Sequence, residues 1–184
     1  MKMNKNVVAI VVALGMTSAA HAAVSDQGSG KVTFTGSIID AACSISPEHS
    51  DQTVELGQIS KVALKDSGTS QPRHFEIKLE NCEFGEKEPN KLQITFTGKE
   101  ANGSNDLLGI TGTAKGAGVA ILDAAGNKIK LGEPTSPQEL QNGDNTLLFS
   151  AYLQGEGASG EGNPAAEIVP GDFQAVTDFK LAYN

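Results

Sequence analysis

Apolar and polar residues alternate with a period of two along most of the chain after residue 30. Such alternation indicates strands with one buried face and one face in water. It is clearest over residues 75–79 and 92–96, where every second residue is Phe, Ile or Leu. The predicted strands cover residues 31–39, 53–59, 75–82, 92–97, 118–122, 128–131, 147–153 and 173–183.

Turn residues separate these segments at short intervals. Residues 123–127, which include Gly126, predict the loop of a hairpin between the strands at 118–122 and 128–131. Helix signals are poor, although residues 136–140 could form one turn with Pro137 at its first position. Many short strands with regular turns predict a single all-β domain, a sandwich or a barrel.

The first 22 residues have the features of a cleaved signal peptide. Lys2 and Lys5 precede a short apolar run over residues 7–16, and Ala20-His21-Ala22 is a cleavage motif. The apolar run is too short to span a bilayer. We therefore expect an exported chain that begins at Ala23 and does not insert into the membrane.

The charge of the exported chain is strongly negative. The whole sequence carries −8, and removing the two lysines of residues 1–22 brings it to −10. Nucleic acids and anionic membranes both attract lysine and arginine, so neither is expected as a partner.

The two cysteines predict a structural disulfide. Cys43 and Cys82 enter an oxidising compartment on export, where an even cysteine count usually means a bridge. A reactive thiol pair or a metal site is the alternative, but there is no CxxC motif and no histidine cluster. Closing a loop of this length should stabilise the fold by roughly 4 kcal/mol.

Nothing in the sequence favours catalysis. Residues 155–160 match G-x-G-x-x-G but lack the strand and helix of a dinucleotide site, so they predict a loop. His49 and His74 have no partner at metal-ligand spacing, and no nucleophile elbow occurs. We predict no enzyme activity, no catalytic, cofactor-binding or metal-binding residue, and no cofactor.

The two ends of the mature chain carry a family resemblance. Gly171 is fourteenth from the end, and alternation from there leads to the penultimate Tyr183. Near the N-terminus of the mature chain, residues 30–36 have the sequence Gly-Lys-Val-Thr-Phe-Thr-Gly, and Cys43 follows. Residues 56–59 and 79–82 agree as well. The chain resembles the chaperone–usher pilins, most closely the major rod subunits of P-type and MR/P-type fimbriae.

The resemblance implies an incomplete immunoglobulin-like sandwich that lacks its final strand. Residues 23–31 are expected to be a donor-strand extension and residues 32–184 the pilin domain. A missing edge strand leaves core residues and backbone groups exposed, and a strand from another molecule repairs both defects. In the family, a periplasmic chaperone supplies that strand first. The next subunit replaces it at the outer-membrane usher.

The donor strand should insert residues of one parity. The expected inserting residues are Val24, Asp26, Gly28, Gly30, Val32 and Phe34. Val32 and Phe34 are the expected apolar anchors, although Phe34 could instead belong to the first strand of its own domain.

The C-terminal strand is the expected acceptor and chaperone-binding segment. Its expected groove and chaperone-binding residues are Gly171, Phe173, Ala175, Thr177, Phe179, Leu181, Tyr183 and Asn184. The resemblance also implies that basic residues of the chaperone hold the Asn184 carboxylate.

The resemblance predicts a structural subunit of a surface fimbria that supports cell adhesion. We expect export through the periplasm of a Gram-negative cell, and donor-strand exchange into an extracellular homopolymer. The alternatives are a minor adaptor or anchor pilin and, from another class, a tip adhesin that binds a host glycan. A tip adhesin of this family has an additional N-terminal lectin domain, whereas this sequence predicts one domain.

Overall fold

The computed structural model describes residues 28–85, 90–101, 104–157 and 166–184. The expected signal peptide and the first residues of the expected donor extension, including Val24 and Asp26, lie outside the described residues. The chain divides into two units, Met1–Ile38 and Ile39–Asn184.

The described residues of the first unit form no strand. Val32, Phe34 and Ile38 are 74%, 90% and 103% exposed. The strand predicted over residues 31–39 is therefore absent, because an alternating sequence forms a strand only when a neighbouring strand is present to pair with it.

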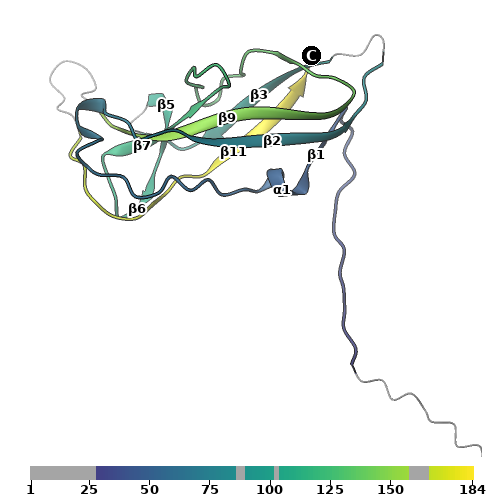
Figure 1. The fold of residues 1–184 in the computed structure, drawn as a ribbon, viewed down its shortest axis with the longest axis horizontal. Coiled ribbons are helices and arrows are strands. Elements are labelled where there is room, and N and C mark those ends of the chain that lie inside the picture. The colour runs from purple at the N-terminus through teal and green to yellow at the C-terminus, as the bar shows by residue number, and fades with distance from the viewer. Residues whose placement is uncertain (1–27, 86–89, 102–103, 158–165) are drawn as a thin grey trace, which may run out of the picture. The chain divides into compact units, whose positions relative to one another are not determined.

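The second unit contains a six-stranded antiparallel sheet (Figure 1). In spatial order its strands are β1 (Ser44–Ile45), β2 (Arg73–Cys82), β9 (Gly143–Gly155), β7 (Ala117–Leu122), β5 (Ser104–Gly109) and β4 (Glu100–Ala101). The long pair β2 and β9 forms its centre, with Phe75 opposite Phe149.

A second sheet holds the C-terminus of the chain. Its spatial order is β11 (Thr177–Tyr183), β3 (Lys91–Gly98) and β8 (Gln138–Glu139). β11 pairs with β3 along its whole length, from Thr177 opposite Gly98 to Tyr183 opposite Leu92. Just before β11, the short strand β10 (Phe173–Gln174) pairs with β6 (Thr111–Gly112).

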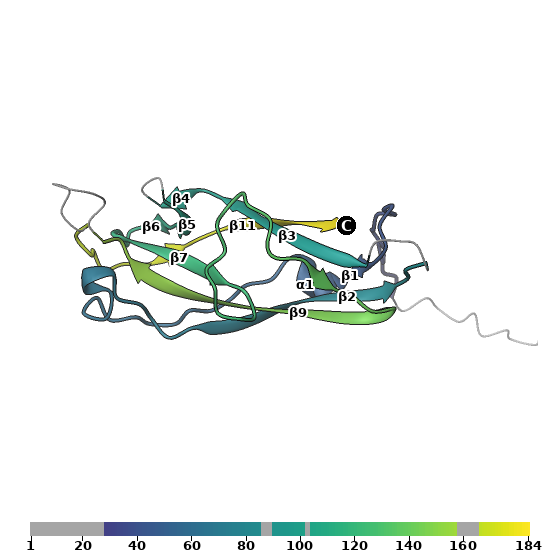
Figure 2. The same cartoon turned by 90° about the horizontal axis from the view of Figure 1, so that it is seen from above.

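The two sheets pack face to face around one apolar core. Figure 2 shows β2, β9 and β7 in one layer and β3 and β11 in the other. Their inward faces meet where Phe96 of β3 contacts Phe149 of β9. The largest fully buried side chains are Phe96, Phe149, Ile77, Leu79, Leu92 and Ile94. The predicted all-β fold and its buried strands are confirmed.

Some local predictions were wrong. Residues 136–140 contain β8 instead of a helical turn, because Glu139 and Gln138 pair with β3. Residues 128–131 form only an isolated bridge, Leu122 with Lys128, although the 123–127 loop is present. Residues 53–59 form no strand. Described helix is limited to α1 (Pro47–Ser50) and the 3₁₀ turn η1 (Lys65–Ser67).

The predicted disulfide is confirmed. Cys43 and Cys82 are bonded, with both side chains buried in the core. The bond ties the beginning of the second unit to the last residue of β2. The glycine pattern at 155–160 starts at the last residue of β9, and residues 158–160 lie outside the described part.

Candidate functional site

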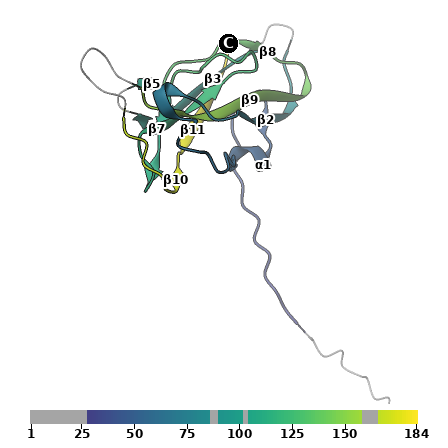
Figure 3. The ribbon, with the colours of Figure 1, turned by 60° about the vertical axis from the view of Figure 1, so that its left-hand side comes forward.

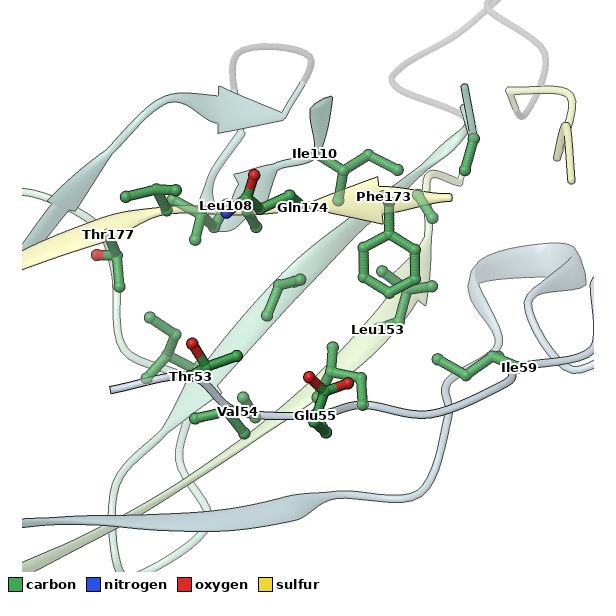
Figure 4. A pocket seen from close by; sticks show the side chains of 18 of the residues that line it. Thr53, Val54, Glu55, Ile59, Leu108, Ile110, Leu153, Phe173, Gln174 and Thr177 are labelled. Carbon is green, nitrogen blue, oxygen red and sulfur yellow. The ribbon is translucent and has the colours of Figure 1, made fainter. Parts of the chain in front are cut away.

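A long open groove of about 1440 Å³ runs along one edge of the sandwich. One wall is the segment 51–59, which follows α1, and the other is the C-terminal segment 168–179 (Figure 4). The apolar side chains of its floor come from both sheets: Phe75, Ile77, Phe96, Leu108, Val119, Ile121, Ala151 and Leu153.

The C-terminal wall keeps a strict alternation through β10 and β11. Phe173, Ala175, Thr177 and Phe179 are half-buried, and the residues between them are exposed. Figure 3 shows this wall in yellow, passing through β10 into β11. β11 pairs with β3 on one side only, and no described strand pairs with its other edge. The backbone N–H and C=O groups of that outer edge therefore face the groove unpaired.

The opposite wall lacks backbone pairing as well. Within the described part of the chain, residues 53–59 make no hydrogen bond. Val54, Leu56 and Ile59 are half-buried, and Leu56 and Ile59 pack against the core. These contacts hold an extended segment in place and leave its backbone polar groups available.

Both ends of this wall are fixed by short-range contacts. At its start, Gln52 donates from Nε2 to the Glu76 carbonyl at 3.1 Å, and just before it His49 Nε2 lies 3.6 Å from Glu76 Oε1. The hydrogen bond from Lys78 lowers the pKa of the Glu76 carboxyl. After it, Ala63 donates its N–H to the Ser60 carbonyl.

Charged residues line both ends of the groove. Asp51 and Asp178 line one end, near Thr53 and Thr177 in Figure 4. Lys61 and Lys115 line the other end, beyond Ile59. Lys115 is placed there because its backbone bridges Val169. Asp172 lies at this second end as well, and Glu55 lines the middle of the groove. One end of the groove therefore carries only acidic groups, and the other end carries groups of both signs.

The predicted acceptor residues fall into two groups. Gly171, Phe173, Ala175, Thr177 and Phe179 line the groove, and Leu181 and Tyr183 do not. The last two are half-buried against the core further along β11.

The end of β11 is tied to the neighbouring strand. The Tyr183 ring lies 6.5 Å from the ring of Phe84. Burial raises the pKa of Tyr183, whose hydroxyl has no hydrogen-bond partner within the described residues. Asn184 is exposed and donates its N–H to the Lys91 carbonyl at 2.7 Å.

Gly171 is required by a close backbone approach. A Cβ there would lie 2.7 Å from the Ala114 nitrogen and would also meet the Thr113 hydroxyl. Asp172 closes the same contact, because its carbonyl accepts the N–H groups of Thr113 and Ala114. Any larger residue at Gly171 would push the C-terminal wall away from this loop.

The C-terminal wall was predictable from the alternation over residues 173–183, whereas the opposite wall was not. The alternation of Val54 and Leu56 with polar residues predicts a strand, and the same pattern also fits a groove wall with a single buried side. Of the expected donor residues, Gly28, Gly30, Val32 and Phe34 are described, and all four are exposed.

The described residues contain no group of three or more His, Cys, Asp or Glu side chains placed to hold a metal ion. Among them, no helix has the length and apolar character needed to cross a membrane. An apolar floor between two unpaired backbone edges is suited to taking up an extended peptide.

Comparison with known proteins gives consistent matches. The family model described as "Fimbrial protein" matches residues 32–184. The Fimbria A protein of Serratia marcescens is 60% identical over 184 residues, covering 100% of both chains. The Major MR/P fimbria protein of Proteus mirabilis is 50% identical over 186 residues, again covering 100% of both. A solved structure of a chaperone–usher pilus superposes with a TM-score of 0.72 at 34% identity, covering 86% of this chain and 97% of that chain.

Proposed function

Because the chain belongs to the fimbrial protein family and is a structural subunit of a fimbria, we propose that its groove takes up the N-terminal segment of a second copy. Fimbrial subunits polymerise with their neighbours into appendages on the surface of Gram-negative bacteria. The pairing of segment and groove is the step that joins one subunit to the next.

One observation carries this proposal: both walls of the groove are bare backbone edges. β11 has a free outer edge, and residues 53–59 make no hydrogen bond within the described part of the chain. A single inserted strand pairs with both walls and covers the apolar floor. It therefore satisfies the exposed backbone and removes apolar surface from water in one step.

The described residues that fit this role are 28–38. They form no strand, and Val32, Phe34 and Ile38, all of one parity, are highly exposed. Gly36 has the same parity. The donor segment in this proposal therefore continues past Lys31 as far as Ile38, where the first unit ends.

Before assembly, the groove needs a temporary occupant. We propose that a periplasmic chaperone fills it with a strand of its own and holds the C-terminal carboxylate of Asn184. The outer-membrane usher is then the place of exchange. This order is supported by the groove, since an uncovered edge of this length invites aggregation. The family is structural, and the proposal assigns no enzymatic activity to the chain.

The test uses two full-length variants that differ in which face of the donor segment is altered. Phe34→Asp places a charge on the inserting face, and Thr35→Asp places the same charge on the solvent face. Filament growth is followed by light scattering and electron microscopy. Phe34→Asp should fail to polymerise alone and should shorten wild-type filaments, because it still accepts a strand.

Thr35→Asp should polymerise nearly as wild type does, since its new charge faces water. Equal growth of the two variants would contradict the proposed insertion of Phe34.

A further inference from the structure

We propose that Lys31 of the incoming segment lies opposite Asp178 of the accepting copy, and that this ion pair selects the register. The inference rests on the proposed function and adds a specificity-determining pair to it. Neither Lys31 nor Asp178 forms an ion pair within the described part of its own chain.

The direction follows from charge. Lys31 is the only charged residue in the stretch 28–39. The end of the groove with Asp51 and Asp178 carries only acidic groups and attracts Lys31, whereas at the other end Lys61 and Lys115 offset the attraction of Asp172. Lys31 therefore belongs at the Asp178 end.

From that end, only one direction keeps the apolar donor residues in the groove. The lining of the C-terminal wall runs from residue 168 to Phe179. If the donor ran parallel to β11 from Asp178, residues 32–38 would pass beyond Phe179 and leave the groove. Running antiparallel, the same residues pass over Thr177, Ala175 and Phe173. This direction also carries Asp40 towards Lys61 and Lys115.

Parity then restricts the register to steps of two residues. Val32 and Phe34 must face the floor together with Thr177 and Ala175, so Lys31 must lie opposite a solvent-facing residue of β11. Val176, Asp178 and Lys180 are the nearest candidates, and all three are exposed. Opposite charges on directly facing strand positions attract and like charges repel, so Asp178 is selected over Lys180 and over the uncharged Val176.

Side-chain size selects the same register independently. With Lys31 opposite Asp178, the large Phe34 lies opposite the small Ala175. Gly36 then lies opposite Phe173, and Gly30 opposite Phe179. Large residues therefore face small ones at each of these positions, which is how a groove is filled without voids or clashes.

A shift of one register step destroys this match. Phe34 would face Thr177, Ile38 would face Phe173, and Gly36 would face Ala175. The first two pairs become crowded, and the third leaves a gap. The opposite shift, with Lys31 opposite Val176, would place Phe34 against Phe173 and Gly36 against Gly171, so that one pair is crowded and the other leaves a gap. Charge and volume therefore agree on one alignment.

Because Lys31 and Asp178 both face solvent, their pair should act mainly on the rate of strand uptake. Charges at the rim of an interface change the association rate and its salt dependence more than they change the final stability. Reversing one of them should slow polymerisation by about three- to tenfold at low salt. The difference should shrink at high salt, where screening is strong.

The experiment uses two full-length variants that each reverse one charge, Lys31→Glu and Asp178→Lys. Alone, each variant faces itself with a like-charged pair and should polymerise slowly. In a mixture, the donor segment of the Lys31→Glu copy meets the groove of the Asp178→Lys copy, so that a carboxylate faces an ammonium group. In the opposite pairing, the donor segment of the Asp178→Lys copy enters the groove of the Lys31→Glu copy. This pairing restores the original contact between Lys31 and Asp178.

The mixture should therefore grow at close to the wild-type rate and form alternating copolymers. Tagging the two variants separately allows alternation to be read by electron microscopy.

The matched control is Glu139→Lys, which reverses an exposed carboxylate on β8, at the far edge of the same sheet and outside the groove. It should not be slowed in the same way, and mixing it with Lys31→Glu should not restore growth. The proposed pairing is overturned if both single variants polymerise at the wild-type rate. It is also overturned if both are slow and mixing does not restore the rate. Either result leaves the proposed strand uptake itself intact. Failure of the wild-type chain to polymerise under the same conditions would instead contradict the proposed function.

Discussion

Phe96 of β3 and Phe149 of β9 meet edge to face across the core, with their ring centroids 5.3 Å apart. Each ring also contacts a further one. Phe149 stacks on Phe75 of β2 at 5.5 Å, and Phe96 contacts Phe179 of β11 at 6.3 Å. This row of four rings joins the two sheets and ends in the wall of the groove, so the core and the acceptor wall are one packed structure.

Removing the central ring should therefore be costly. We expect Phe149→Ala to lower the free energy of unfolding by about 3–5 kcal/mol, because it deletes a fully buried ring and leaves a cavity between the sheets. The neighbouring Leu148→Ala is the control. Leu148 is 55% exposed, so its loss should change stability by no more than about 0.5 kcal/mol. Denaturant unfolding followed by circular dichroism measures both, and equal losses would contradict this account of the core.

The disulfide should contribute through the unfolded chain. Replacing both Cys43 and Cys82 with serine removes a bridge with a sequence separation of 39 residues, and should cost roughly 4 kcal/mol. The measurement is the difference in unfolding free energy between the variant and the oxidised wild-type chain. A loss below about 1 kcal/mol would show that the bridge has little influence on folding.

Tyr183 should tolerate the loss of its hydroxyl but not of its ring. The hydroxyl is buried without a hydrogen-bond partner in the described residues, whereas the ring packs on Phe84. Tyr183→Phe should leave the melting temperature unchanged or raise it, since an unpaired buried hydroxyl is unfavourable. Tyr183→Ala should lower stability by about 3 kcal/mol. A marked loss of stability in Tyr183→Phe would contradict this prediction, because it would mean that the hydroxyl has a hydrogen-bond partner.

The loop after β7 should respond to acid. Burial raises the pKa of the Asp123 carboxyl, but the hydrogen bonds that it accepts from Asn127 and Ala125 outweigh this effect and hold the pKa below its ordinary value of 3.8. A depressed pKa stabilises the folded state above the ordinary value, and this stabilisation is lost as the pH falls through the folded pKa.

We therefore compare the wild-type chain with Asp123→Ala at several pH values. The variant should be less stable by about 1 kcal/mol near neutral pH, and the difference should narrow below pH 3.8. Thermal unfolding at each pH provides the measurement. A difference that stays constant from neutral to acid pH would contradict the role assigned to the carboxylate.

Much of this structure could be predicted from the pattern of single residues. The strict alternation at Phe75–Leu79, Leu92–Phe96 and Thr177–Tyr183 marked long strands with one buried face, and all three are strands in the structure. The cysteine count indicated the disulfide. In each case the preference of a residue and its near neighbours agrees with the way the chain packs. These residues alone are therefore sufficient to predict the local structure.

The errors arose where pairing depends on a distant partner. Residues 53–59 and 31–39 alternate as strands do, yet each lacks a neighbouring strand in the described part of the single chain. Their sequences are suited to strands that form only on assembly. The charges at the two ends of the groove could not be predicted either, because the fold brings Asp51, Asp178 and Lys115 into one groove from widely separated parts of the chain.

Hydrogen exchange of residues 28–38 in assembled filaments tests the central claim most directly. The account predicts that the amides of this segment exchange rapidly in the unassembled chain and become strongly protected in filaments, because the segment then forms a strand between β11 and residues 53–59 of the next copy. Protection should appear in residues 53–59 at the same time. Filaments in which residues 28–38 exchange as rapidly as they do before assembly would contradict the account.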